Sequence, residues 1–197
     1  MKKMKTQVYQ FKISLKGIAP KIWRRIQVPA TYSFWDLSVA IQNAMAWGGH
    51  HLHEFRIMNP RSGVEEEIGI PDEDDAPHVR KGWTTKISRN FTLENNKAIY
   101  IYDFGDYWEH IVELEKILPA DPGMTYPCCI AGKRRAPPDD VGSVTGYEEF
   151  VAIMKDPDHE EYEEMVAWYG DVYDPDDFDC TEVCFMDPGE MLRLMQE

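Results

Sequence analysis

The most informative run of residues in this chain is Tyr102-Asp103-Phe104-Gly105-Asp106-Tyr107-Trp108-Glu109-His110. Two segments that overlap its ends are rich in apolar and aromatic residues, 98–103 and 108–117. Each is typical of a β-strand. Gly105 lies between them and permits the positive φ that a tight turn often requires. The run therefore predicts a β-hairpin with its turn at 104–106.

The N-terminal part of the chain predicts a second hairpin followed by a helix. Apolar and polar side chains alternate over residues 9–15, and residues 22–28 form the next predicted strand after a turn that contains Gly and Pro. Ser33 stands three residues before Asp36, ahead of apolar residues with helical spacing. This pattern indicates a capping box and a helix that ends at Gly48-Gly49.

The remaining segments are read from composition and spacing. Residues 50–58 are predicted to form a strand with Leu52 in the core. Residues 64–82 predict an acidic surface loop, and residues 119–145 a long irregular segment. Helical spacing then predicts three helices, at residues 146–155, 158–169 and 187–196.

Together these elements predict an α+β fold. We expect a mixed β-sheet built on the N-terminal hairpin, with a covering helix in a β-grasp-like arrangement and further helices at the C-terminus. The length of 197 residues suits a single domain over 1–197. Its predicted core spans 6–118, and an irregular and helical part spans 119–197.

Composition disfavours several classes of function. The net charge of −14 is unfavourable for direct nucleic-acid binding, which requires a surplus of Lys and Arg. The sequence contains no apolar run of about 18 residues, so no membrane partner is expected. No apolar region follows the basic start at 1–5 as it would in a signal peptide, so we expect a cytoplasmic protein with reduced thiols.

The charge is unevenly distributed along the chain. Residues 1–25 hold eight Lys or Arg residues, Arg24 among them, and no acid. A local basic patch is one interpretation of this bias. A solvated face of the hairpin is the favoured one.

The first candidate site lies in the run quoted above. The carboxylates of Asp103 and Asp106, with the imidazole of His110, could bind a divalent metal or perform acid–base chemistry. The structural alternative is that the Asp residues form the turn through local hydrogen bonds, while Trp108 and its aromatic neighbours fill the core.

The second candidate is His50-His51-Leu52-His53. On a strand, His51 and His53 would point to the same face and could ligate zinc with a third residue. The alternative is a strand edge whose imidazole rings pack on neighbouring side chains.

The cysteines are weaker candidates for a metal site. Cys128 and Cys129 are adjacent, which is awkward for chelation, and Cys180-x-x-x-Cys184 departs from the usual C-x₂-C spacing. Buried free thiols are the favoured interpretation. The basic residues of 132–135 lack the spacing of a phosphate-binding loop, and no cofactor is predicted.

Several segments together resemble the plasmid pRiA4b ORF-3-like proteins. In the order of that family, the matching segments are Tyr9-Gln10-Phe11-Lys12-Ile13, Pro20-Lys21-Ile22-Trp23-Arg24-Arg25, Leu52-His53-Glu54-Phe55, the run from Tyr102 to His110, Pro127-Cys128, Pro137-Pro138-Asp139-Asp140-Val141-Gly142 and Gly146-Tyr147-Glu148-Glu149-Phe150. The resemblance implies a widespread prokaryotic group, sometimes encoded on plasmids or beside transposable elements, with no settled activity. Some members carry further cysteines where this chain has Ala136 and Val141, which weakens a metal site built from that loop.

Three functions remain open. The leading hypothesis is a non-catalytic binding or interaction module for a protein partner or small ligand, with predicted binding residues Asp103, Asp106, Trp108, His110, His53 and Arg24. The first alternative is a metal-dependent, hydrolase-like enzyme that uses Asp103, Asp106 and His110, with His51 or His53 nearby. The second alternative, implied by the resemblance, is an accessory protein of plasmid or mobile-element biology.

Overall fold

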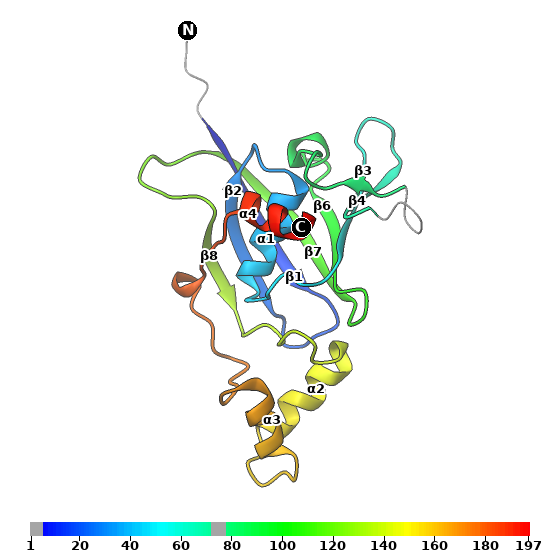
Figure 1. Ribbon diagram of the computed structural model, residues 1–197. Coiled ribbons are helices and arrows are strands. Elements are labelled where there is room, and N and C mark those ends of the chain that lie inside the picture. The colour runs from blue at the N-terminus through cyan, green and yellow to red at the C-terminus, as the bar shows by residue number, and fades with distance from the viewer. Residues whose placement is uncertain (1–5, 72–77) are drawn as a thin grey trace.

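The computed structural model describes residues 6–71 and 78–197 (Figure 1). Its eight-stranded sheet has the order β5 (Arg80–Lys81), β4 (Glu65–Gly69), β3 (His53–Met58), β6 (Lys97–Tyr102), β7 (Trp108–Pro119), β1 (Gln7–Leu15), β2 (Trp23–Pro29) and β8 (Cys128–Lys133). Among the strand pairs of the described residues, only that of β4 with β5 is parallel, so the sheet is mixed. The α+β class is confirmed, whereas the strand order does not confirm the β-grasp-like arrangement. The basic start at 1–5 and part of the acidic segment, 72–77, lie outside the described residues.

Both predicted hairpins are confirmed. β1 pairs with β2 so that Phe11 lies opposite Ile26, and β6 pairs with β7 so that Tyr102 lies opposite Trp108. β1 also pairs with β7, which places the two hairpins side by side in the middle of the sheet. Because side chains alternate between the faces of a strand, the apolar residues of both hairpins reach the same core.

The predicted loop at 64–82 is wrong, because β4 and β5 lie within it. Ile68 of β4 is buried, and the carboxylate of Glu66 accepts hydrogen bonds from side chains of other segments. The irregular segment predicted at 119–145 is likewise wrong where β8 pairs with β2. The partner of β8 is distant in sequence, whereas β4 pairs with the neighbouring strand β3 and was missed because its composition is acidic.

Helix α1 (Phe34–Ala44) begins at the predicted capping box. Asp36 N donates to Ser33 Oγ over 3.1 Å, and Ser33 N donates to the Asp36 carboxylate over 2.7 Å. α1 lies over the apolar face of the sheet, and α4 (Pro188–Gln196) lies against α1 (Figure 1). Trp35 Nε1 donates to Pro188 O over 2.8 Å and joins the two helices.

Replacing the capping hydroxyl is expected to weaken the fold. Ser33→Ala should lower the free energy of unfolding by about 1 kcal/mol, because a helix N–H loses its acceptor. Ser143→Ala is the control, since no side-chain hydrogen bond caps α2 (Ser143–Met154), and it should change the value by less than about 0.5 kcal/mol. Urea denaturation at pH 7 measures both, and equal losses would contradict the capping role.

Helices α2 and α3 (Tyr162–Tyr169) lie together beyond one end of the sheet (Figure 1). Phe150 of α2 makes edge contacts with the rings of Trp168, Tyr169 and Tyr173. Aromatic contacts thus join the helices that the sequence predicts at 146–155 and 158–169. The described residues also form two short 3₁₀ helices, η1 (Ile87–Arg89) and η2 (Cys180–Glu182).

The face of the sheet away from α1 carries charged residues of the N-terminal hairpin, but not Arg24, which lies on the core face. Lys16 pairs with Glu109 at 3.0 Å and Arg25 pairs with Glu115 at 2.7 Å, so these cations are balanced by β7. The predicted core residue Leu52 is instead 51% exposed, because β3 begins one residue later. Within 6–71 and 78–197, no helix has the length and apolar character needed to cross a membrane.

Candidate metal centre

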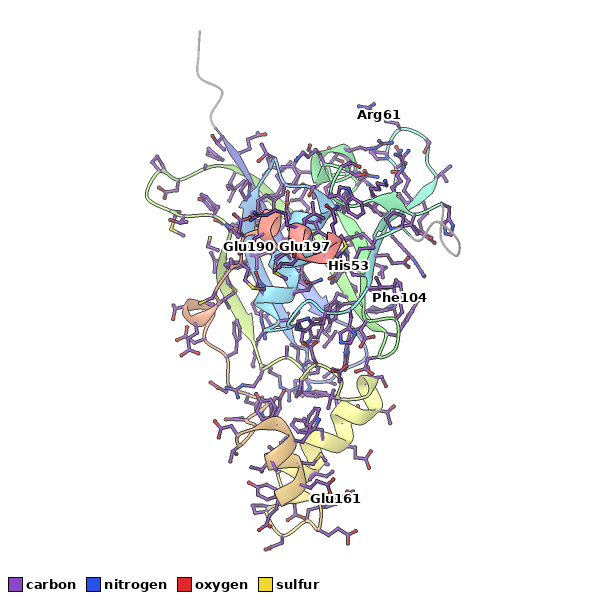
Figure 2. All side chains as sticks on the ribbon, viewed as in Figure 1. His53, Arg61, Phe104, Glu161, Glu190 and Glu197 are labelled. Atoms are coloured by element: carbon purple, nitrogen blue, oxygen red, sulfur yellow. The ribbon has the colours of Figure 1, made fainter. Side chains whose placement is uncertain are left out.

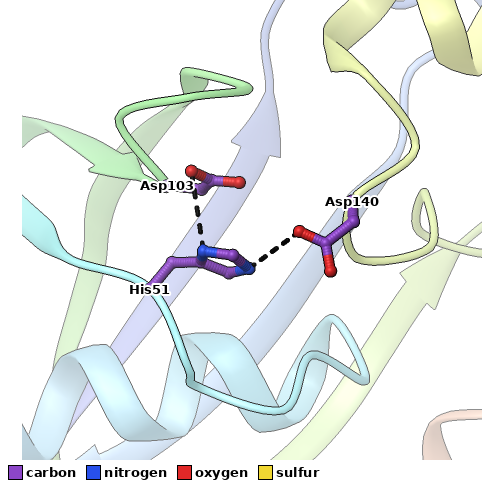
Figure 3. A group of neighbouring side chains, drawn as sticks. All are labelled: His51, Asp103 and Asp140. Atoms are coloured by element: carbon purple, nitrogen blue, oxygen red, sulfur yellow. Dashed lines mark ion pairs between the residues drawn. The ribbon is translucent and has the colours of Figure 1, made fainter.

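Three side chains of metal-ligating type converge beside the turn between β6 and β7 (Figure 3). His51 Nδ1 lies 3.7 Å from Asp103 Oδ1, and His51 Nε2 lies 3.2 Å from Asp140 Oδ1. One ligand atom from each residue lies within 4.8 Å of the other two. His51 precedes β3, Asp103 follows β6, and Asp140 lies between β8 and α2, so the tertiary fold brings them together.

The two aspartates of the cluster, Asp103 and Asp140, share an unusual backbone conformation. Asp103 has a φ of 57° and Asp140 a φ of 60°, which is the left-handed region. Asp tolerates this region better than most residues, yet it is sparsely populated outside Gly. Residues held there by the surrounding structure cluster at functional sites.

Hydrogen bonds connect the segments that carry the cluster. Asp103 N donates to Leu52 O over 2.9 Å, which joins the end of β6 to the segment of His51. Gly142 N donates to Asp106 Oδ2 over 3.0 Å, which joins the segment of Asp140 to the turn. The predicted site residue Asp106 therefore positions the cluster and is not one of its members.

The cluster opens to solvent and has a ligand set suited to divalent ions. The side chains of His51, Asp103 and Asp140 are 27%, 12% and 72% exposed. One imidazole nitrogen with carboxylate oxygens suits ions such as Zn²⁺ and Mn²⁺. Three protein ligands would leave a coordination position for water.

Two of the predicted site histidines are core residues instead. His53 is 3% exposed and His110 is 0% exposed, and burial lowers the pKa of each to about 4. The prediction that His51 and His53 share a strand face is wrong, because His51 lies before β3, where the two-residue period does not apply. His110 faces the core in the alternation of β7 and lies outside the cluster of Asp103.

The aromatic residues of the quoted run divide between core and surface. Trp108, a predicted binding residue, is 1% exposed, and its ring centroid lies 6.1 Å from that of Trp47. Phe104 and Tyr107 are 47% and 46% exposed, and Phe104 lies at the margin of the molecule (Figure 2). The structural interpretation of the run therefore holds for Trp108 and for Asp103, whose Oδ1 accepts from Gly105 N over 2.8 Å within the turn, but not for the exposed rings of Phe104 and Tyr107.

All four cysteines are free thiols. Burial raises the pKa of Cys128 and that of Cys129, the latter to about 11, so both thiols are protonated at pH 7. The described part of the chain has no metal-ligand cluster that includes a cysteine.

Two further residues are of interest, of which the sequence predicted Arg24 as a binding residue and did not single out Asp140. Arg24 is 2% exposed on the core face of β2, and its signal is that it alternates in step with the buried Ile22 and Ile26. Asp140 was absent from the predicted site residues. Its one signal is a place in the segment 137–142, which follows the order of the resembled family.

Comparison with known proteins gives consistent results. A family model described as plasmid pRiA4b ORF-3-like protein matches residues 7–182. The uncharacterized protein y4hQ of Sinorhizobium fredii is 34% identical over 172 residues, which cover 85% of this chain and 83% of the relative. A crystal structure of a protein of unknown function from Methanosarcina mazei Go1 is 50% identical, with a TM-score of 0.86 over 92% of this chain and 100% of that chain. These matches confirm the resemblance drawn from the motifs.

Proposed function

We propose that this chain, which belongs to the plasmid pRiA4b ORF-3-like family, is a binding module that holds a divalent metal ion between His51, Asp103 and Asp140. The observation that carries the proposal is the convergence of their ligand atoms within 4.8 Å. The metal is the small ligand of the module.

Charge and preorganisation both support a cation at this place. Two carboxylates held near each other repel, and a divalent ion neutralises both at once. The left-handed backbone at Asp103 and Asp140 fixes their direction before an ion arrives, which reduces the ordering cost of binding. The exposed Asp140 gives the ion a path from solvent.

Calorimetric titration with Zn²⁺ and Mn²⁺, after dialysis against a chelator, tests the proposal. We expect one equivalent to bind to the unmodified protein. Loss of a residue that only hydrogen-bonds a metal ligand lowers the metal affinity about 10–100-fold. Because His51 and Asp140 are proposed as ligands themselves, His51→Ala and Asp140→Asn should each lower the metal affinity more than about 100-fold.

The control is His78→Ala. His78 Nε2 lies 2.7 Å from Glu67, a histidine–carboxylate pair outside the cluster, and its loss should leave the affinity unchanged. Affinities that are equal in the cluster variants and the unmodified protein would refute the proposal, as would the lack of one-to-one binding.

A metal-dependent hydrolase at the same cluster is the second candidate. It is favoured by the three-residue ligand set, which leaves room for a metal-bound water that could act as nucleophile. This arrangement replaces the predicted combination of Asp103, Asp106 and His110. Water-proton relaxation of the Mn²⁺-loaded protein should reveal at least one rapidly exchanging bound water, and its absence would exclude hydrolysis by this route. A role in plasmid or mobile-element biology stays a prediction.

A further inference from the structure

Arg24 is a buried cation that has no carboxylate partner in the described part of the chain. It is 2% exposed, and no acidic residue of the described chain forms an ion pair with it. Burial lowers its pKa to about 10, so it remains charged at pH 7. A charge in this position normally requires a compensating anion.

Backbone carbonyl groups supply only part of that compensation. Arg24 Nε donates to Ala44 O over 2.7 Å, at the negative end of α1, and Nη1 donates to Trp23 O and Lys133 O over 2.9 and 3.2 Å. Nη2 has no acceptor among the described residues. The guanidinium carbon lies 3.7 Å from the ring centroid of Phe178, so the aromatic ring covers one side of the group.

Arg24 lines a cavity of about 590 Å³, within the range of small-molecule sites. Its apolar lining includes Met45, Trp47 and Val183. This combination of an apolar wall and one charged donor group is typical of sites for small organic ligands.

The other charged residues of the cavity limit the charge of the ligand. Arg135 is paired with Asp177, and Asp179 Oδ1 accepts from Thr181 N over 2.8 Å. Glu182 adds a further negative charge to the lining. These carboxylates repel a dianion more strongly than a monoanion, and Arg24 attracts a charged group that lies directly against it.

We propose that this cavity binds a small organic monoanion, with its carboxylate or sulfonate group on Arg24 Nη2 and its apolar body against Met45 and Trp47. Such a ligand would complete the hydrogen bonding of the guanidinium and supply the missing negative charge. The site is separate from the metal cluster, because none of His51, Asp103 and Asp140 lines the cavity.

Two fluorescent probes of similar shape separate the charge from the apolar contact. 8-Anilinonaphthalene-1-sulfonate carries a sulfonate, and N-phenyl-1-naphthylamine lacks it. In the presence of chelator, we expect the sulfonate probe to bind one site at least tenfold more tightly than the neutral probe. Arg24→Met should remove this preference and change the affinity for the neutral probe by less than about threefold. Equal binding of the two probes to the unmodified protein would overturn the proposal.

A second variant locates the site even where Arg24→Met fails to fold. Cys184 lies on the cavity lining and is exposed, so Cys184→Trp fills the cavity without entering the core. It should weaken the sulfonate probe at least tenfold, while Ile130→Trp, at an exposed position of β8 outside this cavity, should not. Unaltered binding to Cys184→Trp would place the probe elsewhere and refute the assignment. Because chelator is present throughout, failure of the metal proposal would not alter these results.

Discussion

Acidification from pH 7 to pH 4 is expected to lower the free energy of unfolding by several kcal/mol. Burial lowers the pKa of His53 and of His110 to about 4, from an ordinary value of 6.5. Between these values the unfolded chain binds more protons than the folded chain, so stability falls as pH falls. Each histidine should cost about 2 kcal/mol by pH 5 and about 3 kcal/mol by pH 4.

Urea denaturation at several pH values between 6.5 and 5 measures this loss before most carboxylates titrate. His110→Phe should remove roughly half of the pH dependence in this window. His110 Nε2 has no hydrogen-bond partner within the described structure, so Phe sacrifices mainly the contact of Nδ1 with Tyr100 O at 3.3 Å. His78→Phe, at an exposed position, is the control and should leave the slope unchanged. A slope that is the same with and without His110 would show that its burial does not govern acid stability.

Trp108→Ala is expected to lower the free energy of unfolding by about 3–5 kcal/mol, the range for removal of a large buried aromatic side chain. Trp108 is 1% exposed and lies against Trp47 in the core. The substitution removes apolar burial and leaves a cavity that neighbouring strands can close only in part. Urea denaturation at pH 7 measures the loss.

Phe104→Ala is a control from the same run of sequence. Phe104 is 47% exposed in the turn, and its replacement should change the free energy of unfolding by less than about 0.5 kcal/mol. Comparable losses in the two variants would mean that the turn contributes as much to the core as β7 does, contrary to the burial of these residues.

The elements with local causes were predictable from the sequence. Alternation at 9–15 predicts β1, and Ser33 with Asp36 predicts the start of α1. In each case the residues that form the element lie within a few positions of one another. By contrast, β8 was missed because its partner β2 is distant in sequence. β4 pairs with the neighbouring strand β3 and was missed because its acidic composition is atypical of a strand.

The sequence alone determined the family and the α+β class, but it determined only part of the candidate site. It marked Asp103 through its place in the aromatic, acidic run, and it raised His51 as a possible ligand. Only the tertiary structure decided that Asp140 completes the cluster and that His110 lies in the core. The physical reason is that the direction of a side chain on a strand follows the local alternation of residues. Which loops come into contact depends instead on the order of the strands in the sheet. His51, Asp103 and Asp140 meet because pairing of β3 with β6 and the hydrogen bond from Gly142 to Asp106 bring three loops to one place.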